Sequence, residues 1–234
     1  MSGVVDIRDW GVAAMLLASA TLVSRSARSD SARLLVFVHA CVKQRALQNQ
    51  IQGALPGIDV TAVGRISDFE RTLKQGTDAV LALPIVIEAF KLSVGLRGYR
   101  GGSPEEAYSL VAAGAAPDPH QVAAVGALDL LGRDGTNNFV KDVLGRTCRV
   151  ERVSKVEDLL PLLQMQRVEA ILLPARLQSE IKATSKLDLV GTELAKKVGL
   201  PAASSVTAIG TQVISALGKM PMNVLRTLGV DSWH

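Results

Sequence analysis

The sequence predicts an α/β protein built from two similar, pseudo-repeated lobes with a ligand cleft between them. Two observations support this fold class. From Ala32 onward, short apolar runs of strand length alternate with stretches of helical pattern, and a strand–helix–strand–Pro unit occurs twice in the chain. The chain has 234 residues, 48% of them hydrophobic, which is enough apolar material for two lobes of about 100 residues each.

The first part of the chain alternates strands and helices. The continuous apolar run Leu34–Val38 is typical of a parallel strand buried on both faces, Ile58–Val63 is predicted as the next strand, and Ala79–Leu83 as a third, buried one. Helices are predicted between them, over Cys41–Leu55 and from Ser67 to Gln75. Ser67, followed by Glu70 three residues later, predicts a capping box at the start of the second helix.

A second copy of this pattern follows in the other half of the chain. Residues 63–73 (V-x-R-I-S-x-F-E-x-x-L) align with residues 150–160 (V-x-R-V-S-x-V-E-x-x-L). The first copy ends at 78–84 (DAVLALP) and the second at 169–174 (EAILLP). A chance match between two ordinary strand–helix–strand segments is the alternative. A true repeat predicts two similar lobes.

The remaining elements complete the two lobes. The segments Leu92–Gly102 and Glu106–Val111 are predicted as a hairpin-like pair, with a β-turn at the glycines of 98–102. Residues 113–119 (AGAAPDP) and 201–205 are predicted linkers. Strands are expected at 122–131 and 187–190, a polar turn at 132–138, and helices at 139–144, 207–217 and 222–228. Lobe one is therefore expected to comprise 33–118 and 201–234, and lobe two 119–200.

The N-terminal residues resemble an export signal. Residues 11–23 (GVAAMLLASATLV) form an apolar run that is too short to span a membrane comfortably, and Ala18-Ser19-Ala20 matches an A-x-A cleavage pattern. Residues 1–32 are thus predicted as a signal peptide or leader, which implies a periplasmic or otherwise exported protein. Asp6 and Asp9 do not fit a positively charged n-region, and an N-terminal amphipathic helix packed on the domain is the alternative.

Composition and motifs argue against several classes of function. Aromatic residues make up only 3% of the chain, and its 26 basic residues are interleaved with 22 acidic ones, so no nucleic-acid partner is expected. Cys41, Cys148 and three scattered histidines predict no metal site, and the two cysteines are compatible with one disulfide or with none. Phosphate-loop, dinucleotide-binding and nucleophile-elbow motifs are absent, so neither a cofactor nor a catalytic residue is predicted.

Candidate ligand-binding residues follow from the geometry of α/β sheets. Ligands bind beyond the carboxyl ends of the strands, where helix N-termini offer free N–H groups. The residues predicted at these ends are His39, Pro84, Asp134, Gly135, Thr136, Asn137, Asn138 and Arg176. Alternatives remain open: Asp134 or Thr136 could cap a helix, His39 could simply end a strand, and Arg176 could be a solvated surface residue.

Further motifs show a resemblance to a known family. The motifs G-L-R-G-Y-R-G-G at 95–102, E-x-x-Y-S-L-V at 105–111, A-V-G-A-L-D-L-L-G-R at 124–133 and L-G-V-D-S-W at 228–233 resemble segments of type 2 periplasmic solute-binding proteins. Within that group the chain is most similar to the phosphate/phosphonate-type binding proteins of ABC transporters, over about residues 33–233. The resemblance implies a monomer that binds a small anionic or polar ligand between two lobes, without catalysis, and delivers it to a membrane permease.

Two other hypotheses are kept beside this one. The apolar segment Pro84–Ile87 at the edge of the first lobe favours an interaction or sensory module that works without a ligand. An enzyme that uses the same cleft would need a general base, for which His39 is the visible candidate.

Overall fold

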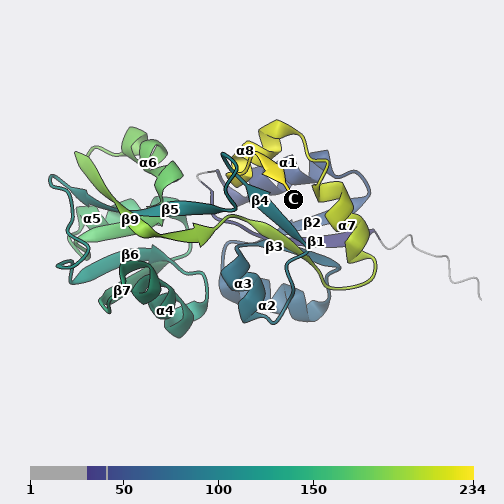
Figure 1. Ribbon diagram of the computed structural model, residues 1–234, viewed down its shortest axis with the longest axis horizontal. Helices are drawn as coiled ribbons and strands as arrows, with labels where there is room; N and C mark the ends of the chain where they lie inside the picture. Colours follow the sequence, from purple (N-terminus) through teal and green to yellow (C-terminus); the bar gives the residue numbers. More distant parts are fainter. Residues whose placement is uncertain (1–30, 41) are drawn as a thin grey trace, which may run out of the picture. The chain divides into compact units, whose positions relative to one another are not determined.

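The computed structural model describes residues 31–40 and 42–234. Nearly all of the predicted leader (residues 1–32) and Cys41, one half of the considered disulfide, lie outside these residues. The described chain forms two mixed α/β sheets, each with helices, which confirms the predicted fold class (Figure 1). Among the described residues, no helix is both long enough and apolar enough to cross a membrane.

Lobe one contains a six-stranded sheet in the order β11-β4-β10-β3-β1-β2. Its strands are β1 (Ala32–Phe37), β2 (Ile58–Ala62), β3 (Ala79–Ala82), β4 (Leu96–Tyr99), β10 (Ala202–Ser205) and β11 (Ser232–Trp233). Its helices are α1 (Gln44–Ala54), α2 (Ile66–Gln75), α3 (Pro84–Ala89), α7 (Gly210–Leu217) and α8 (Met222–Leu228). β1 is parallel to β2 and β3, and β10 is antiparallel to β3.

The alternation of side chains along β1 explains why this strand is apolar from Leu34 to its end. Leu34 and Val36 pack into a cluster with residues of α1, α7 and α8, on one face of the sheet. Leu35 and Phe37 point to the other face, where they join residues of α2 and α3. Figure 1 shows these two groups of helices on opposite faces. When both faces of a strand are buried, the side chains on both faces are apolar.

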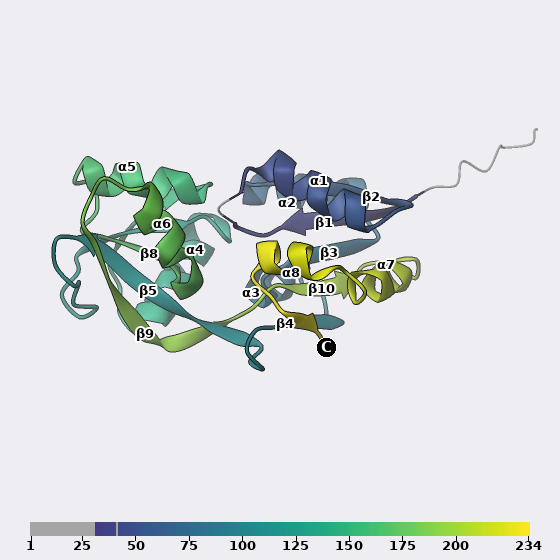
Figure 2. The ribbon, with the colours of Figure 1, turned by 90° about the horizontal axis from the view of Figure 1, so that it is seen from above.

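Lobe two contains a five-stranded sheet in the order β7-β6-β8-β5-β9. Its strands are β5 (Glu105–Ala113), β6 (Ala124–Leu128), β7 (Arg149–Val153), β8 (Ala170–Pro174) and β9 (Leu189–Gly199). Its helices are α4 (Gly132–Leu144), α5 (Leu159–Gln164) and α6 (Gln178–Thr184), with short 3-10 turns η1 (Val156–Asp158) and η2 (Ala175–Leu177). β5 and β9 are paired along most of their length and lie side by side in Figure 2.

The repeat is visible in both sheets. In lobe one the strands β2-β1-β3 are parallel neighbours, and in lobe two β7-β6-β8 have the same order and direction. Asp78 accepts a hydrogen bond from the backbone N–H of Arg33, at 2.8 Å, just before β3. Glu169 does the same with the N–H of Ala123, at 2.8 Å, just before β8. The acidic residues that the sequence alignment paired therefore perform the same structural task.

The helical half of the alignment is shifted. The structure matches the start of α2 at Ile66 with the start of η1 at Val156, whereas the sequence alignment paired Ile66 with Val153. Apolar residues recur every three or four positions in a helix, so a slip of three residues preserves the pattern. The predicted capping box is also wrong: Arg65 is the N-cap of α2, it makes no side-chain cap bond, and Ser67 lies inside the helix.

Several connections differ from the prediction. The expected hairpin of 92–102 with 106–111 does not form, because β4 belongs to the first sheet and β5 to the second. The turn between them is confirmed: Arg100 and Ser103 exchange backbone hydrogen bonds of 2.9 and 3.0 Å around Gly101 and Gly102. The predicted linker 201–205 contains β10, and the loop after Ala113 joins two strands of the second sheet. Turn residues mark a reversal of the chain without specifying which sheet receives the next strand.

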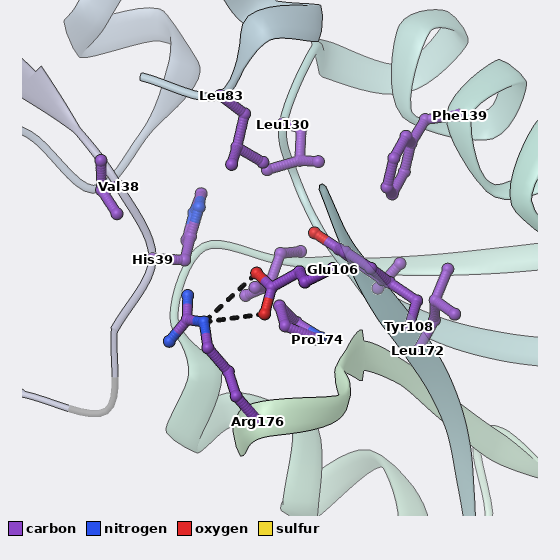
Figure 3. Close-up of a pocket in the computed structure, with 12 residues that line it drawn as sticks. Val38, His39, Leu83, Glu106, Tyr108, Leu130, Phe139, Leu172, Pro174 and Arg176 are labelled. Atoms are coloured by element: carbon purple, nitrogen blue, oxygen red, sulfur yellow. Dashed lines mark hydrogen bonds and ion pairs between the residues drawn. The ribbon is translucent and has the colours of Figure 1, made fainter. Parts of the chain in front are cut away.

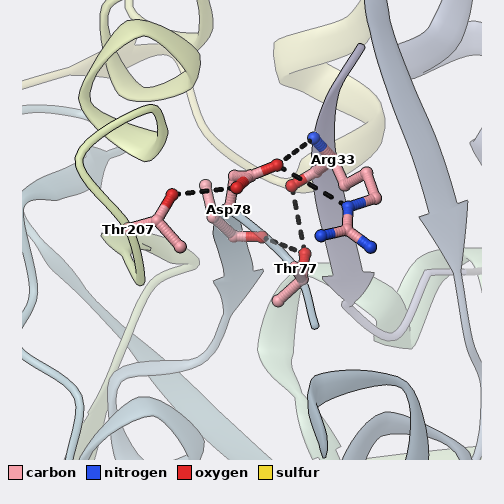
Figure 4. A network of polar contacts seen from close by, with 5 residues as sticks. Arg33, Thr77, Asp78 and Thr207 are labelled. Carbon is pink, nitrogen blue, oxygen red and sulfur yellow. Dashed lines mark hydrogen bonds and ion pairs between the residues drawn. The ribbon is translucent and has the colours of Figure 1, made fainter. Parts of the chain in front are cut away.

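A polar network fixes the amino end of β1 against β3 (Figure 4). Asp78 accepts hydrogen bonds from the Arg33 N–H and from the Thr207 hydroxyl, both at 2.8 Å. The Thr77 hydroxyl donates to the Arg33 carbonyl oxygen at 3.0 Å. The hydrogen bond from the Arg33 backbone is the main cause that lowers the pKa of Asp78, so the carboxylate is charged at neutral pH.

Candidate ligand-binding site

Strand ends from both lobes surround a small cavity, which we name the inner cavity (Figure 3). Its walls are largely apolar, with four polar side chains. The lining residues are Val38, His39, Leu83, Glu106, Tyr108, Ala127, Leu128, Leu130, Phe139, Leu172, Pro174 and Arg176. The cavity volume of about 20 Å³ is room for about one water molecule. In this conformation, the protein's own side chains fill the inner cavity.

A buried ion pair lies at one side of the inner cavity. Arg176 Nε is 3.2 Å and 3.0 Å from the two carboxylate oxygens of Glu106, and each side chain is 10% exposed. Burial raises the pKa of Glu106, while the neighbouring Arg176 opposes this shift. The two charges neutralise each other, so this pair leaves the cavity without net charge.

Arg176 also touches lobe one. Gly229 follows the last residue of α8 in the left-handed conformation, with φ of 81°. A Cβ atom at Gly229 would lie 2.5 Å from Arg176 Nε, so only a glycine leaves room for the guanidinium there. The carboxyl end of a helix carries partial negative charge, which favours a cation at this position. Arg176 is thus held between Glu106 of lobe two and the end of α8 in lobe one.

His39 adds an uncharged imidazole to the lining of the inner cavity. Its ring contacts Phe37 edge-on, with 5.0 Å between ring centroids. Both ring nitrogens are buried, and neither has a hydrogen-bond partner among the described residues. Burial lowers the pKa of His39 to about 4, with Asp129 opposing the shift and Arg176 adding to it. At neutral pH the ring therefore offers one donor and one acceptor to a ligand or a water molecule.

Tyr108 completes the polar set. Its hydroxyl points into the inner cavity (Figure 3), and its ring packs edge-on against Phe139 at a centroid distance of 5.6 Å. Burial raises the pKa of this phenol, so it stays protonated and able to donate a hydrogen bond.

A larger cavity, which we name the outer cavity, shares Val38 and His39 with the inner one. It has a volume of about 320 Å³ and lies between the start of α1 in lobe one and the loop after β7 in lobe two. The remaining lining residues are Ala40, Val42, Lys43, Gln44, Arg45, Leu47, Ser154, Lys155, Val156 and Glu157. Three cations thus face one carboxylate, in a volume that suits a small organic molecule.

The predicted polar turn at 132–138 is instead the beginning of α4. Asn137 and Asn138 are exposed on the helix, and with Asp134 and Gly135 they line neither the inner nor the outer cavity. Gly132 takes a positive φ of 72°, which glycine adopts without strain, and so turns the chain between the strand and the helix.

Thr136 has a structural task. It is fully buried, its hydroxyl donates to Asp129 Oδ1 at 3.0 Å, and it accepts hydrogen bonds from the N–H groups of Leu130 and Leu131, both at 3.1 Å. Asp129 pairs in turn with Arg152 at 2.7 Å. Leu131 is the N-cap of α4, so neither Thr136 nor Asp134 caps the helix. The Thr136 hydroxyl holds the strand-to-helix turn and is not free for a ligand.

Of the residues predicted from sequence, the structure brings His39 and Arg176 together at the inner cavity. Pro84 is the buried first residue of α3 and lines a separate cavity of about 290 Å³. Glu106 and Tyr108 were not predicted as site residues, although both are polar residues in a largely apolar strand, which is a signal that could have identified them. Lys43, Arg45, Ser154 and Lys155 were not predicted either. No group of residues able to hold a metal ion occurs in residues 31–40 and 42–234.

Comparison with known proteins shows that this two-lobe fold occurs in many solved structures. Neither the search of protein-family profiles nor that of curated proteins gives a match. Many solved structures share the fold, which is that of the periplasmic binding proteins and Venus flytrap domains.

Three of these structures illustrate the range of proteins that share the fold. Arginine-binding protein from T. maritima has 16% identity and a TM-score of 0.56, over 85% of this chain and 90% of its own. An arginine 3rd transport system periplasmic binding protein from Legionella pneumophila has 13% identity and a TM-score of 0.53, over 84% and 92%. A Xanthomonas citri protein bound to ATP has 10% identity and a TM-score of 0.61, over 87% and 90%. At such identities the likeness concerns the fold.

Proposed function

We propose that this chain is an exported binding protein whose two lobes close over a small ligand that carries an anionic group. The observation that carries the proposal is the pair of adjoining cavities at the strand ends of both lobes, with cations from each lobe facing the outer one. Binding proteins of this architecture work by hinge closure. Here the chain crosses between the sheets at 100–104 and 200–201, so a change in few backbone angles is enough to move the lobes.

The charge of the outer cavity supports an anion. Lys43, Arg45 and Lys155 face a single carboxylate, that of Glu157, whereas Glu106 and Arg176 of the inner cavity are already paired with each other. A cationic ligand such as the arginine bound by the T. maritima protein would find the wrong sign of charge at this opening. The fold itself accepts an anionic ligand, since the X. citri neighbour is bound to ATP.

The polar groups of the site are suited to binding and not to a reaction. Neutral His39 has no hydrogen-bonded nucleophile beside it among the described residues, and Tyr108 stays protonated. We therefore assign no catalytic residue. An ABC-transporter permease is the partner we propose, supported by the transport-system name of the Legionella neighbour and by the signal-like residues 11–23.

A thermal-shift screen tests the proposal. Phosphate, phosphonates and small carboxylates are added to the purified chain at matched ionic strength, with arginine and uncharged amides as controls. A ligand that binds the folded chain raises the melting temperature by mass action, and a concentration of 100 times Kd stabilises it by about 2.7 kcal/mol. We expect a shift with at least one anion and none with arginine. If no compound of the screen raises the melting temperature, the proposal that the chain binds a small molecule is wrong.

One observation favours a second candidate, a module that signals or binds a partner without a small ligand. The inner cavity has room for about one water, because Leu83, Leu130 and Phe139 occupy the space where a ligand would meet the strand ends. Small-angle scattering separates the two candidates: a ligand-independent module keeps the same radius of gyration with every compound of the screen, whereas a transport-type binding protein becomes more compact with its ligand.

A further inference from the structure

We propose that lobe two carries a docking groove for a partner protein, whose docking segment presents an aromatic or large aliphatic side chain beside lysine or arginine residues. The groove lies between η1 and the start of α5 on one side and α6 on the other, and we name it the lobe-two groove. The inference goes beyond the proposed function, because docking at this groove needs no small ligand in either cavity.

The lobe-two groove is a recess with an apolar floor. Its volume of about 510 Å³ is larger than that of the outer cavity. Val156 and Ile181 line it although each is only 3% exposed, so its floor is the surface of the core of lobe two. The half-buried Leu160 and the exposed Ala183 add apolar walls. An apolar recess of this size at the surface is typical of a binding site.

The two repeats differ at this place. In lobe one, Phe69 of α2 packs edge-on against Phe90 at the end of α3, with 5.1 Å between the ring centroids. Counted from the starts of α2 and η1, Phe69 corresponds to Leu159. Counted from the starts of α3 and η2, Phe90 corresponds to Ile181. Two aliphatic side chains thus replace two rings, and the groove opens beside them. An aromatic side chain of a partner would restore in lobe two the packing that lobe one provides itself.

The charge of the lobe-two groove favours a basic partner. Glu157 and Glu180 both line it and are exposed, and no cation lines it. Neither glutamate forms an ion pair within the part of the chain that the structure describes. This acidic site contrasts with the net charge of +4 of the whole chain. Lysine or arginine side chains would pair with the two carboxylates, whereas an anionic membrane surface would be repelled.

The placement of the two charges favours a peptide segment as the occupant. Glu157 belongs to η1 and Glu180 to α6, so the carboxylates come from the two elements that flank the apolar floor. Meeting both of them takes two cations, one on each side of the apolar anchor, and a peptide segment supplies that spacing. Anchors of this kind carry most of the binding energy of a protein interface, while charges around them set specificity and association rate.

Selection from a random-peptide display library tests the inference, because it assumes nothing about the partner's sequence. The library is selected on the natural chain at low ionic strength, and the affinities of enriched peptides are measured by fluorescence anisotropy. We expect these peptides to combine an aromatic or large aliphatic residue with lysine or arginine. Their affinity should fall as salt is added, because salt screens exposed charges.

Two pairs of variants locate the binding. Glu180→Lys reverses a charge that lines the groove and neither ligand cavity, and Glu193→Lys does the same at an exposed glutamate of β9 that lines none of the three. Ala183→Phe adds a ring in the groove, and Ser179→Phe adds one on the same helix at a residue that does not line it. Glu180→Lys should weaken peptide binding about three- to tenfold and Ala183→Phe more than about tenfold, with both controls unchanged.

Four results would overturn the inference: no peptide is enriched over a blank support, the enriched peptides are acidic, Ala183→Phe binds them as tightly as the natural chain, or a control loses as much affinity as its matched variant. Circular dichroism and the melting temperature show whether each variant is folded. If Ala183→Phe is not, the comparison of Glu180→Lys with Glu193→Lys decides.

Two further outcomes would assign the lobe-two groove to another occupant and so overturn the protein partner. One is that vesicles of anionic lipid bind the natural chain but not Ala183→Phe. The other is that phenethylamine, a small aromatic amine, binds with the affinity of the peptides. A failure of every small anion to bind would concern the proposed function alone, because the peptide selection does not depend on the two ligand cavities.

Discussion

His39 makes the stability of the folded chain depend on pH. Its pKa is about 4 in the folded chain against 6.5 for an ordinary histidine, so between these values the unfolded chain binds a proton that the folded chain does not. Stability therefore falls as pH is lowered from about 6.5 to about 4, by up to about 3 kcal/mol.

Urea unfolding at a series of pH values between 4 and 7 measures this loss. In His39→Gln the slope of stability against pH across this window is expected to be smaller than in the natural chain. His120→Gln, which removes an exposed histidine of the loop between β5 and β6, is the control and keeps the natural slope. Equal slopes in all three proteins would show that His39 is solvated in solution.

Asp78 is expected to stabilise lobe one through the network of Figure 4. Asp78→Asn removes the charge that receives the Arg33 N–H and the Thr207 hydroxyl, and should cost about 1–3 kcal/mol in urea unfolding at pH 7. The pKa of Asp78 is lowered by folding, so its contribution is present above the ordinary pKa of an aspartate and is lost as pH falls through the lower, folded pKa.

The control for this prediction is Asp59→Asn, because Asp59 is an exposed residue of β2 with no ion pair in the described chain. Glu169→Gln tests the corresponding residue of lobe two and should destabilise in the same direction. A loss at Asp78 no larger than the loss at Asp59 would contradict the role given to the network.

At the scale of elements, the contact between η2 and the end of α8 is expected to hold the lobes together. Gly229→Ala places a Cβ atom against Arg176 Nε and also strains a positive φ. Gly145→Ala is a matched control, since Gly145 follows α4 with φ of 72° and a Cβ atom added there would meet no other atom within 4 Å. Gly229→Ala should cost at least about 1 kcal/mol more than Gly145→Ala, because crowding adds to strain.

A double-mutant cycle isolates the arginine contact. In a background that carries Arg176→Ala, the two glycine substitutions are expected to cost the same, since the crowded atoms are gone. If Gly229→Ala still costs more stability than Gly145→Ala in that background, its effect comes from α8 itself and not from the contact between the lobes.

Sequence patterns predicted the elements better than their connections. The buried strands β1, β3, β6 and β8 were recognisable because strands covered on both faces are continuous apolar runs. The short helices α3 and α6 were missed, since six or seven residues give too few turns for a visible period. Strand partners were assigned wrongly for β4 and β5, because pairing depends on contacts far apart in the sequence.

The candidate site was predicted only in part for a related reason. His39 and Arg176 come just after apolar strands. They were therefore predicted from the rule that ligands bind beyond the carboxyl ends of the strands. Asp134 to Asn138 look like a loop, but the helix begins before them, at Gly132, and turns Asn137 and Asn138 toward solvent. Lys43 and Lys155 lie far apart in the sequence and become neighbours of one cavity only through the fold.

At the scale of the whole molecule, the two lobes are expected to unfold together. One cluster of buried side chains runs through both of them, including Leu35 and Phe37 of the first sheet and Leu110 and Val125 of the second. Differential scanning calorimetry of the described domain should therefore give a single transition whose van't Hoff and calorimetric enthalpies agree. Two separated peaks would show that the shared cluster is too weak to couple the lobes.

The crossing between the sheets has a consequence for how this architecture is inherited. Lobe two is one continuous segment inserted in lobe one, and its ends meet: the N–H of Leu200 donates to the carbonyl oxygen of Pro104 at 2.8 Å, next to the pairing of Glu105 with Gly199. Removing residues 105–199 would leave two chain ends close enough to be joined by a short loop. Recombination can therefore exchange the second lobe as a cassette, with a new half-site for ligands, while the sheet of the first lobe keeps all six of its strands.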